Sequence, residues 1–282
     1  MSAAQALEPG FAGGAALAPA TGPLLECRGL TMRFGGVVAL DNLDLQIRYG
    51  EVLGLLGPNG SGKTTFFNVL TGIYRASGGT LWHMGRDLSK LTPQQINRAG
   101  ITRTFQRSRL CLELSVFDNI AMGDHQRLNN GLVFNLLQRS ELERQVQDAF
   151  DQARDLARTF SPALAGSMLQ PAGSVSMIDR RRVEICRALI SRPKLLLLDE
   201  PSAGMTHEET RELMEDIMMV RERIPGLTVV IIEHEMNVIE RITNRCIVLN
   251  YGRRLCEGTY REIAAHPDVQ EAYLGQTHEE AA

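Results

Sequence analysis

The sequence predicts an α/β fold, and three observations lead to that prediction. Short apolar runs at residues 51–56, 195–198 and 227–232 have the length of buried strands. Longer stretches lie between them, of which residues 141–160 are the clearest, with apolar side chains at helical spacing and charges on the other face. A glycine-rich loop follows the first strand and precedes a helix, which is the order of elements in α/β folds.

The size and composition fit one large α/β domain, or one domain with a small lobe. The chain has 282 residues, of which 44% are hydrophobic and 22% are charged, so it can form a sizeable core. The formal net charge of −3 shows no basic excess of the kind that nucleic-acid surfaces carry. No apolar run approaches the roughly 18–20 residues of a membrane span. If the protein serves a membrane, we expect another chain to cross it.

The five cysteines are scattered along the chain and form no Cys-x-x-Cys pair. The sequence therefore indicates neither a zinc site nor a disulfide framework, and we expect reduced thiols in a cytosolic protein. These residues are Cys27, Cys111, Cys186, Cys246 and Cys256.

The first part of the chain is expected to contain a tail, three strands and a helix. Residues 1–23 are rich in Ala, Gly and Pro and lack the basic start of a signal peptide, so a disordered tail is expected there. Gly72 and the cluster at residues 77–79 are expected to break the chain. The expected elements are strands at residues 24–28, 37–47 and 51–56 and a helix at residues 63–71.

The second part is expected to alternate helices and strands. Thr206 and Glu209 form a capping-box pattern for a helix that runs to about Arg223, where Pro225 and Gly226 follow. Residues 107–190 contain no clear strand, so we expect a separate helical lobe inserted into the core. The expected elements are helices at residues 141–160, 179–189 and 206–223 and strands at residues 195–198, 227–232 and 247–250.

The glycine-rich loop matches the pattern Gly-x-x-x-x-Gly-Lys-[Ser/Thr] and lies between a strand and a helix. Glycines allow the backbone to wrap a phosphate chain with its N–H groups pointing inward, and the helix N-terminus adds partial positive charge. Lys63 is expected to reach the β- and γ-phosphates of ATP, and Thr64 to hold Mg²⁺. The phosphate loop comprises Gly57, Pro58, Asn59, Gly60, Ser61, Gly62, Lys63, Thr64 and Thr65.

Two carboxylates follow the apolar run at residues 195–198. Asp199 is expected to hold Mg²⁺ directly or through water, and Glu200 to activate the attacking water as general base. Acidic residues are common at strand ends, but a phosphate loop about 135 residues earlier makes the pair strong evidence for ATP hydrolysis.

In these motifs and their order the chain resembles an ABC-transporter ATPase. Phe34 matches the aromatic residue that stacks on adenine in that family. Gln106 matches the glutamine that senses Mg²⁺ and the γ-phosphate, and His234 matches the switch histidine that contacts the γ-phosphate. The resemblance implies a P-loop NTPase core with an inserted helical lobe at about residues 107–190. It covers an ATPase domain at residues 24–275, followed by a tail at residues 276–282.

Three segments narrow the resemblance to the larger ATPase of branched-chain amino-acid importers: residues 103–106, 129–134 and 266–275. Urea and amide importers have similar subunits, as does the lipopolysaccharide-export ATPase, which lacks the insertion at 129–134. The resemblance implies a peripheral subunit on the cytoplasmic face of the membrane, with ATP and Mg²⁺ as cofactors. It also implies two transmembrane permease subunits, a second ABC ATPase subunit and, indirectly, a solute-binding protein. No nucleic-acid partner is expected.

The signature loop departs from the family's Leu-Ser-Gly-Gly-Gln. This chain has Val175, Ser176, Met177, Ile178 and Asp179 there. In the family, this loop grips the γ-phosphate bound to the partner's phosphate loop. A β-branched Ile178 is expected to limit backbone approach, and a carboxylate within ~4–6 Å of a phosphate costs on the order of 1–4 kcal/mol.

Thr206 is a further departure, because the family has Asp or Asn at that position. One interpretation is sequence drift that leaves both ATP sites working. The other, which we favour, is a weakened composite site in a heterodimer whose second ATPase supplies an intact signature.

Two alternative functions stay open at this point. One is a regulatory subunit that binds ATP with little turnover, and the other is an export-type or soluble ABC ATPase. The importer interpretation also predicts that residues 106–119 contact a membrane subunit. The apolar side chains expected to provide that contact are Leu110, Leu112, Leu114 and Phe117.

Overall fold

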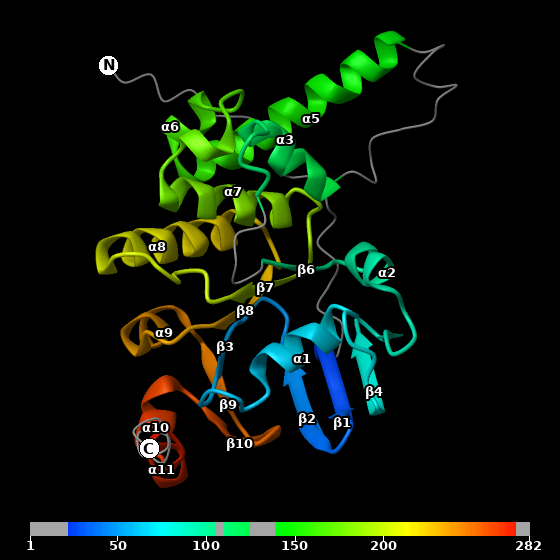
Figure 1. The fold of residues 1–282 in the computed structure, drawn as a ribbon, viewed down its shortest axis with the longest axis vertical. Helices are drawn as coiled ribbons and strands as arrows, with labels where there is room; N and C mark the ends of the chain where they lie inside the picture. Colours follow the sequence, from blue (N-terminus) through cyan, green and yellow to red (C-terminus); the bar gives the residue numbers. More distant parts are fainter. Residues whose placement is uncertain (1–21, 105–109, 125–138, 275–282) are drawn as a thin grey trace.

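The computed structural model describes residues 22–104, 110–124 and 139–274. These residues form two sheets with helices around them (Figure 1). Of the expected tails, residues 1–21 and 275–282 lie outside the described residues, as does the segment 129–134. No helix in the described part of the chain is long and apolar enough to cross a membrane.

The larger sheet has six strands in the order β10-β9-β3-β8-β7-β6. Neighbours from β9 to β6 are parallel, and β10 runs antiparallel to β9. Every residue of β3, β7 and β8 is buried, as expected for parallel strands covered on both faces. The strands are β3 Val52–Leu56, β6 Ile101–Arg103, β7 Leu195–Asp199, β8 Thr228–Ile232, β9 Arg245–Asn250 and β10 Arg253–Gly258.

The smaller sheet is antiparallel, with the order β2-β1-β4-β5. In the pairing of its two long strands, Leu25 lies opposite Ile47. Helix α1, at Lys63–Leu70, packs between the two sheets, where Phe66 and Phe67 are fully buried in one hydrophobic cluster with residues of both. The strands are β1 Leu25–Phe34, β2 Val37–Ile47, β4 Gly78–His83 and β5 Arg86–Asp87.

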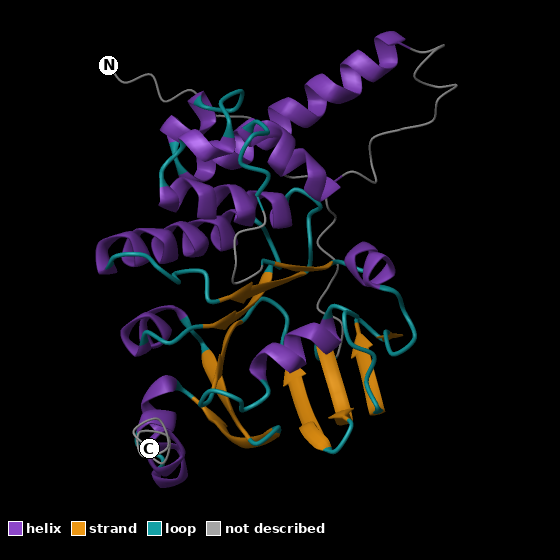
Figure 2. Cartoon of the chain, viewed as in Figure 1, coloured by secondary structure: helices purple, strands orange, loops and turns teal. Residues whose placement is uncertain are grey.

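A second hydrophobic cluster joins the other face of the larger sheet to the helices other than α1 and α2. Helices α3, α5, α6 and α7 gather at the end of the molecule far from the smaller sheet (Figure 2). The helices are α2 Pro93–Arg98, α3 Val116–Ala121, α5 Arg139–Phe160, α6 Pro162–Gly166, α7 Met177–Leu189, α8 His207–Arg223, α9 Met236–Ile242, α10 Tyr260–Ala264 and α11 Pro267–Leu274.

The observed elements agree with most of the expected ones, and the differences have local causes. The capping box of Thr206 and Glu209 forms, and α8 ends at Arg223. The glycines at 78 and 79 do not break the chain, because β4 begins there. Gly79 has φ +83°, and a Cβ at this position would lie 2.4 Å from the Gly29 carbonyl oxygen, so the strand pairing requires glycine. Several short elements had not been predicted individually: β4, β5, α2, β6, α3, α6, α9, β10, α10 and α11.

Candidate functional site

The phosphate loop leaves the carboxyl end of β3 and leads into α1. Gly57 has φ +140°, and a Cβ there would lie 2.1 Å from the Leu249 carbonyl oxygen. Gly62 has φ +105°, and a Cβ there would lie 2.7 Å from the Ala39 carbonyl oxygen. Both positions therefore require glycine. Ser61 is buried, and its hydroxyl has no hydrogen-bond partner among the described residues.

Lys63, the first residue of α1, reaches back over the loop. Its ammonium donates to the carbonyl oxygens of Gly57 at 2.6 Å and Pro58 at 2.9 Å. Burial lowers the pKa of Lys63, and the charges of Glu200 and Asp199 oppose that shift. The lysine therefore sits inside the loop with two carboxylates near enough to act on its charge.

Asp199, at the end of β7, is bound by a residue for which the sequence analysis predicted no role. Arg103, at the end of β6, donates to Asp199 Oδ2 at 2.5 Å and to Asn68 Oδ1 at 2.6 Å. Both charged side chains are at most 5% exposed, so each needs its partner. The two strand ends are adjacent because β6 and β7 pair in parallel.

Glu200 and His234 approach each other from the ends of β7 and β8. His234 Nε2 lies 2.8 Å from Glu200 Oε1. Glu200 has φ +48°, an uncommon conformation for a side-chain-bearing residue, and its N–H donates to the Ile232 carbonyl oxygen. The Glu200 side chain is 18% exposed and that of His234 is 53% exposed. In this arrangement the Glu200 carboxylate can take a proton from water while the His234 imidazole orients that carboxylate.

Glu233 binds the backbone on both sides of this pair, a role that had not been predicted. Its buried carboxylate accepts the N–H groups of Ser202 at 2.8 Å and His234 at 3.3 Å. Burial raises the pKa of this carboxyl above its ordinary value. Glu233 thus connects the loop after β7 to the loop after β8.

Phe34 is the last residue of β1. Its side chain is 41% exposed, and its ring packs edge-on against Tyr74 with centroids 5.1 Å apart. A partly exposed aromatic side chain held by a neighbouring ring suits stacking on a base. Gln106 lies outside the described residues, so its predicted role stays a prediction.

Comparison with known families identifies the fold. Residues 40–203 match the family model described as ABC transporter, a range that contains the phosphate loop and Glu200. The chain belongs to the ABC transporter family. It is an ABC-type ATPase, and residues 253–279 match a second model, described as branched-chain amino acid ATP-binding cassette transporter.

The full-length relatives of this ABC ATPase are transport ATP-binding proteins. It is 42% identical to the high-affinity branched-chain amino acid transport ATP-binding protein LivG of Salmonella typhimurium, over 90% of this chain and 98% of LivG. It is 41% identical to LivG of Escherichia coli K12, with the same coverage. It is 37% identical to BraF of Pseudomonas aeruginosa, again over 90% of this chain and 98% of the relative.

Solved structures agree with this assignment. The ADP conformation of MJ1267, an ATP-binding cassette of an ABC transporter, has a TM-score of 0.76 and 27% identity, covering 90% of this chain and 99% of that one. A nucleotide-free cassette from an ABC transporter has a TM-score of 0.75 and 26% identity, covering 89% and 98%.

The signature segment, residues 175–179, opens helix α7 of this ABC ATPase. Ile178 is only 8% exposed, so its side chain packs inward and the expected steric block does not come from it. Met177 is 50% exposed, and a Cβ added at Gly204 would lie 3.2 Å from the Met177 Cε. Helix α7 begins two residues earlier than expected, which places Ile178 in the first turn rather than in a loop.

Asp179 is held in a charged network at the same helix start. Ser176 is the N-cap, its Oγ accepts the Asp179 N–H at 3.2 Å, and its hydroxyl donates to Asp179 Oδ2 at 2.8 Å. Arg182 contacts Asp179 at 3.0 Å but also binds Glu212 at 2.6 Å and Asp216 at 2.7 Å. Arg182 is therefore shared among three carboxylates, and the guanidinium of Arg180 also lies at this helix start, where it donates to the carbonyl oxygens of Val175 and Gly173.

The expected docking residues separate into two groups. Leu112 and Leu114 are 46% and 43% exposed. Leu110 and Phe117 instead pack against the hydrophobic core, with the Phe117 ring 5.1 Å from that of Phe150. Leu169 had not been predicted, yet it is 77% exposed.

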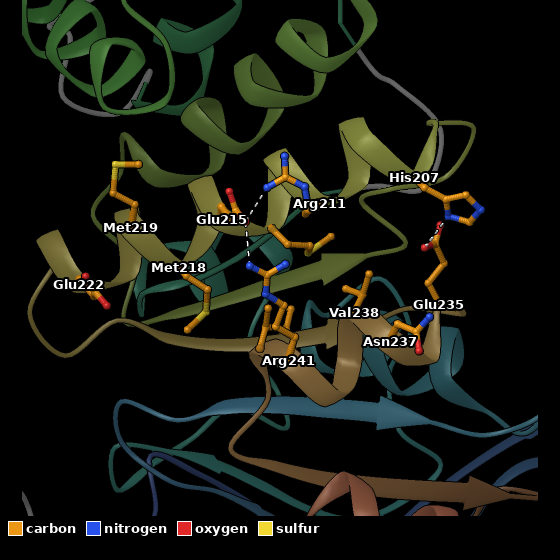
Figure 3. A pocket seen from close by; sticks show the side chains of 12 residues that line it. His207, Arg211, Glu215, Met218, Met219, Glu222, Glu235, Asn237, Val238 and Arg241 are labelled. Atoms are coloured by element: carbon orange, nitrogen blue, oxygen red, sulfur yellow. Dashed lines mark hydrogen bonds and ion pairs between the residues drawn. The ribbon is translucent and has the colours of Figure 1, made fainter.

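A hollow of about 740 Å³ lies away from these residues, between α8 and α9 (Figure 3). It is lined by methionines such as Met218 and by Arg211 and Arg241, which both bind Glu215. None of the predicted site residues lines it, because the nucleotide motifs sit at the loop ends of the strands rather than along the helices.

Proposed function

We propose that this subunit hydrolyses ATP to power uptake of branched-chain amino acids, or of a related small solute, through separate membrane subunits. The observation that carries the proposal is the alignment with LivG, at 41–42% identity over 98% of the relative's length. That alignment accompanies a phosphate loop, a Glu200–His234 pair and a matching C-terminal model in one chain.

In the proposed mechanism, the loop amides and Lys63 bind the phosphates of ATP. Phe34 stacks on the adenine. Glu200 takes a proton from the attacking water, and His234 holds the Glu200 carboxylate in position. Gln106 completes the site as the sensor of the γ-phosphate.

The residues around Lys63 also fit a magnesium ion. Thr64 offers an exposed hydroxyl and Asp199 a carboxylate, the hard oxygen donors that Mg²⁺ prefers, and we assign Gln106 to the same set. Mg²⁺ is commonly held by one or two carboxylates and substrate phosphates rather than by a protein cage. The ion would neutralise charge on the phosphates, and Arg103 holds Asp199 in place beside it.

We infer that the second ATPase subunit is a different chain. The signature segment here keeps Ser176 but adds Asp179, which shares the Arg182 guanidinium with Glu212 and Asp216. A phosphate approaching this helix start meets a carboxylate that already occupies the N-cap hydroxyl. A partner with an intact signature would complete the phosphate loop of this chain and form the faster of two sites.

The membrane subunits are proposed to dock on the exposed leucines of the helical lobe. Backbone hydrogen bonds join Leu112 to Gly173 and Leu114 to Ala172, and the exposed Leu169 lies three residues before Ala172 in the chain. Exposed apolar residues gathered in one place favour an interaction site. Docking there would put this subunit at the cytoplasmic face of the membrane, with the solute-binding protein acting only indirectly.

Reconstitution tests the proposal. The chain is purified with candidate permease subunits and the second ATPase, and uptake of leucine and of urea is measured with and without ATP. We expect permease chains to copurify, cysteine crosslinks from positions 112 and 169 to reach them, and ATP-dependent uptake of leucine. Crosslinks only to the partner ATPase would contradict the docking surface. Uptake of urea alone would contradict the solute class, and association with ribosomes or DNA would contradict the transport role.

A further inference from the structure

The C-terminal helix α11 makes direct contact with the phosphate loop. The hydroxyl of Tyr273, near the end of α11, accepts the N–H of Gly57 at a distance of 2.9 Å, although the two residues are 216 positions apart. This tyrosine belongs to the segment at residues 266–275 that resembles importer ATPases, and the catalytic roles assigned above leave that segment without a task.

Gly57 transmits that contact to the lysine. The residue is buried and tightly enclosed, since a Cβ would lie 2.1 Å from the Leu249 carbonyl oxygen. Its N–H donates to Tyr273, and its carbonyl oxygen accepts a hydrogen bond from the ammonium of Lys63 at 2.6 Å. Two hydrogen bonds therefore connect α11 to the lysine through the residue Gly57.

Tyr273 is itself held firmly. Its ring packs against the large hydrophobic cluster, to which the buried residues Ile263 and Val269 of α10 and α11 also belong. Burial raises the pKa of the Tyr273 hydroxyl, so the group stays neutral at physiological pH. A buried amide left without its acceptor is costly, so the loop start depends on this hydroxyl to keep its geometry.

We propose that Tyr273 is a positioning residue for nucleotide binding, and that the C-terminal segment at residues 267–274 is part of the support of the phosphate loop. The proposal rests on the assignment of the loop as the phosphate site. Tyr273 touches no nucleotide. It acts by holding Gly57 in place. Through Gly57 it also holds the carbonyl oxygens that bind Lys63, and so keeps the loop in the conformation that binds phosphates.

The test compares three variants of the full chain. Tyr273→Phe removes the acceptor and keeps the ring. Tyr260→Phe is the matched control, because Tyr260 of α10 packs against the same cluster and no hydrogen bond among the described residues joins it to Gly57. Lys63→Ala tests the loop itself. The dissociation constant for a fluorescent ADP analogue and the melting temperature without nucleotide are measured for each.

We expect Tyr273→Phe to weaken ADP binding by about 3- to 10-fold, the size of one lost hydrogen bond. In the assembled complex, KM for ATP should rise by a similar factor while kcat stays within about twofold. Tyr260→Phe should bind ADP like the wild type. Wild-type ADP affinity in Tyr273→Phe, with or without a lower melting temperature, would overturn the inference about Tyr273. Weak ADP binding by Lys63→Ala in the same experiment would still support the loop as the phosphate site. Wild-type affinity in Lys63→Ala would overturn both.

Discussion

Helices α1 and α7 both begin at motifs that the ABC family uses for phosphate, yet their first turns are built differently. Helix α1 has Gly62 as N-cap, in a left-handed conformation and without a side-chain cap. Helix α7 has Ser176 as N-cap, bonded to the Asp179 N–H and to the Asp179 carboxylate. A helix start receives an external anion when its own side chains leave the N–H donors free. Helix α1 is therefore free of a side-chain cap, whereas α7 carries its own carboxylate in the first turn.

The charges around the two helix starts differ in the same direction. Lys63 places an ammonium within the loop before α1. At α7, Arg182 is shared among Asp179, Glu212 and Asp216. We expect Lys63 to attract a polyphosphate at the first helix start, whereas Asp179 adds a negative charge at the second. Unequal ATP sites are therefore expected.

The largest effect is expected from Glu200→Gln. The substitution keeps the shape of the side chain near His234 and removes the base, so turnover in the complex should fall by about 10²- to 10⁴-fold. ATP should still bind, and the complex should accumulate in an ATP-loaded state. Measured single-turnover hydrolysis at the wild-type rate would show that Glu200 is not the base.

The next effect is expected from Lys63→Ala. Loss of a charge-assisted contact to the phosphates should weaken ATP binding by roughly 10- to 100-fold and abolish ATP-dependent transport. Equilibrium binding of a fluorescent ATP analogue measures this. Lys90→Ala, at an exposed position outside the loop, serves as the control and should leave binding unchanged. Equal affinities for the two variants would count against the loop as the phosphate site.

A smaller effect, and a gain rather than a loss, is expected when the α7 start is opened. The double variant Met177→Gly and Asp179→Gln removes the exposed side chain and the carboxylate but keeps the buried Ile178, whose removal would leave a cavity. Because a negative charge at the phosphate is lost, ATPase activity of the complex should rise by about 2- to 10-fold. An unchanged steady-state rate would mean that the signature segment is already competent.

The smallest effect concerns Glu233 and pH. Its raised pKa means that the folded protein favours the protonated carboxyl, so its stabilising contribution is full below pH 4.5 and is lost as pH rises through the raised value. Glu233→Gln removes this dependence. Urea unfolding gives the free energy of unfolding of both proteins at each pH. The free energy of the variant minus that of the wild type should be more positive at pH 7 than at pH 4.5. An equal free-energy difference at both pH values would contradict a raised pKa for Glu233.

Two motifs of the candidate site could be predicted because each consists of residues that are adjacent in the sequence. The phosphate loop lies within nine successive residues between a strand and a helix, and Asp199 and Glu200 follow an apolar run of four leucines. Each depends on backbone conformations that glycine or a buried strand dictates. The family order of motifs indicated Glu200 and His234 as separate site residues, but their hydrogen bond to each other was not predicted.

The supporting contacts could not be predicted, because they join residues far apart in the chain. Arg103 meets Asp199 only because the three-residue strand β6 pairs with β7. Tyr273 meets Gly57 only through the packing of α11 on the core. The inward position of Ile178 depends on the residue at which α7 begins, and the apolar spacing of the sequence does not fix that residue.

The most direct test of the unequal sites compares two lysine variants in the assembled complex. In one, Lys63→Ala is made in this chain, and in the other the corresponding phosphate-loop lysine of the partner ATPase is replaced by alanine. Steady-state ATPase rates are measured for both at saturating ATP. In the proposed heterodimer the partner's signature completes the phosphate loop of this chain, so we predict that Lys63→Ala removes nearly all turnover, whereas the partner variant retains a substantial fraction. Equal losses in the two variants, or a greater loss in the partner variant, would contradict the account.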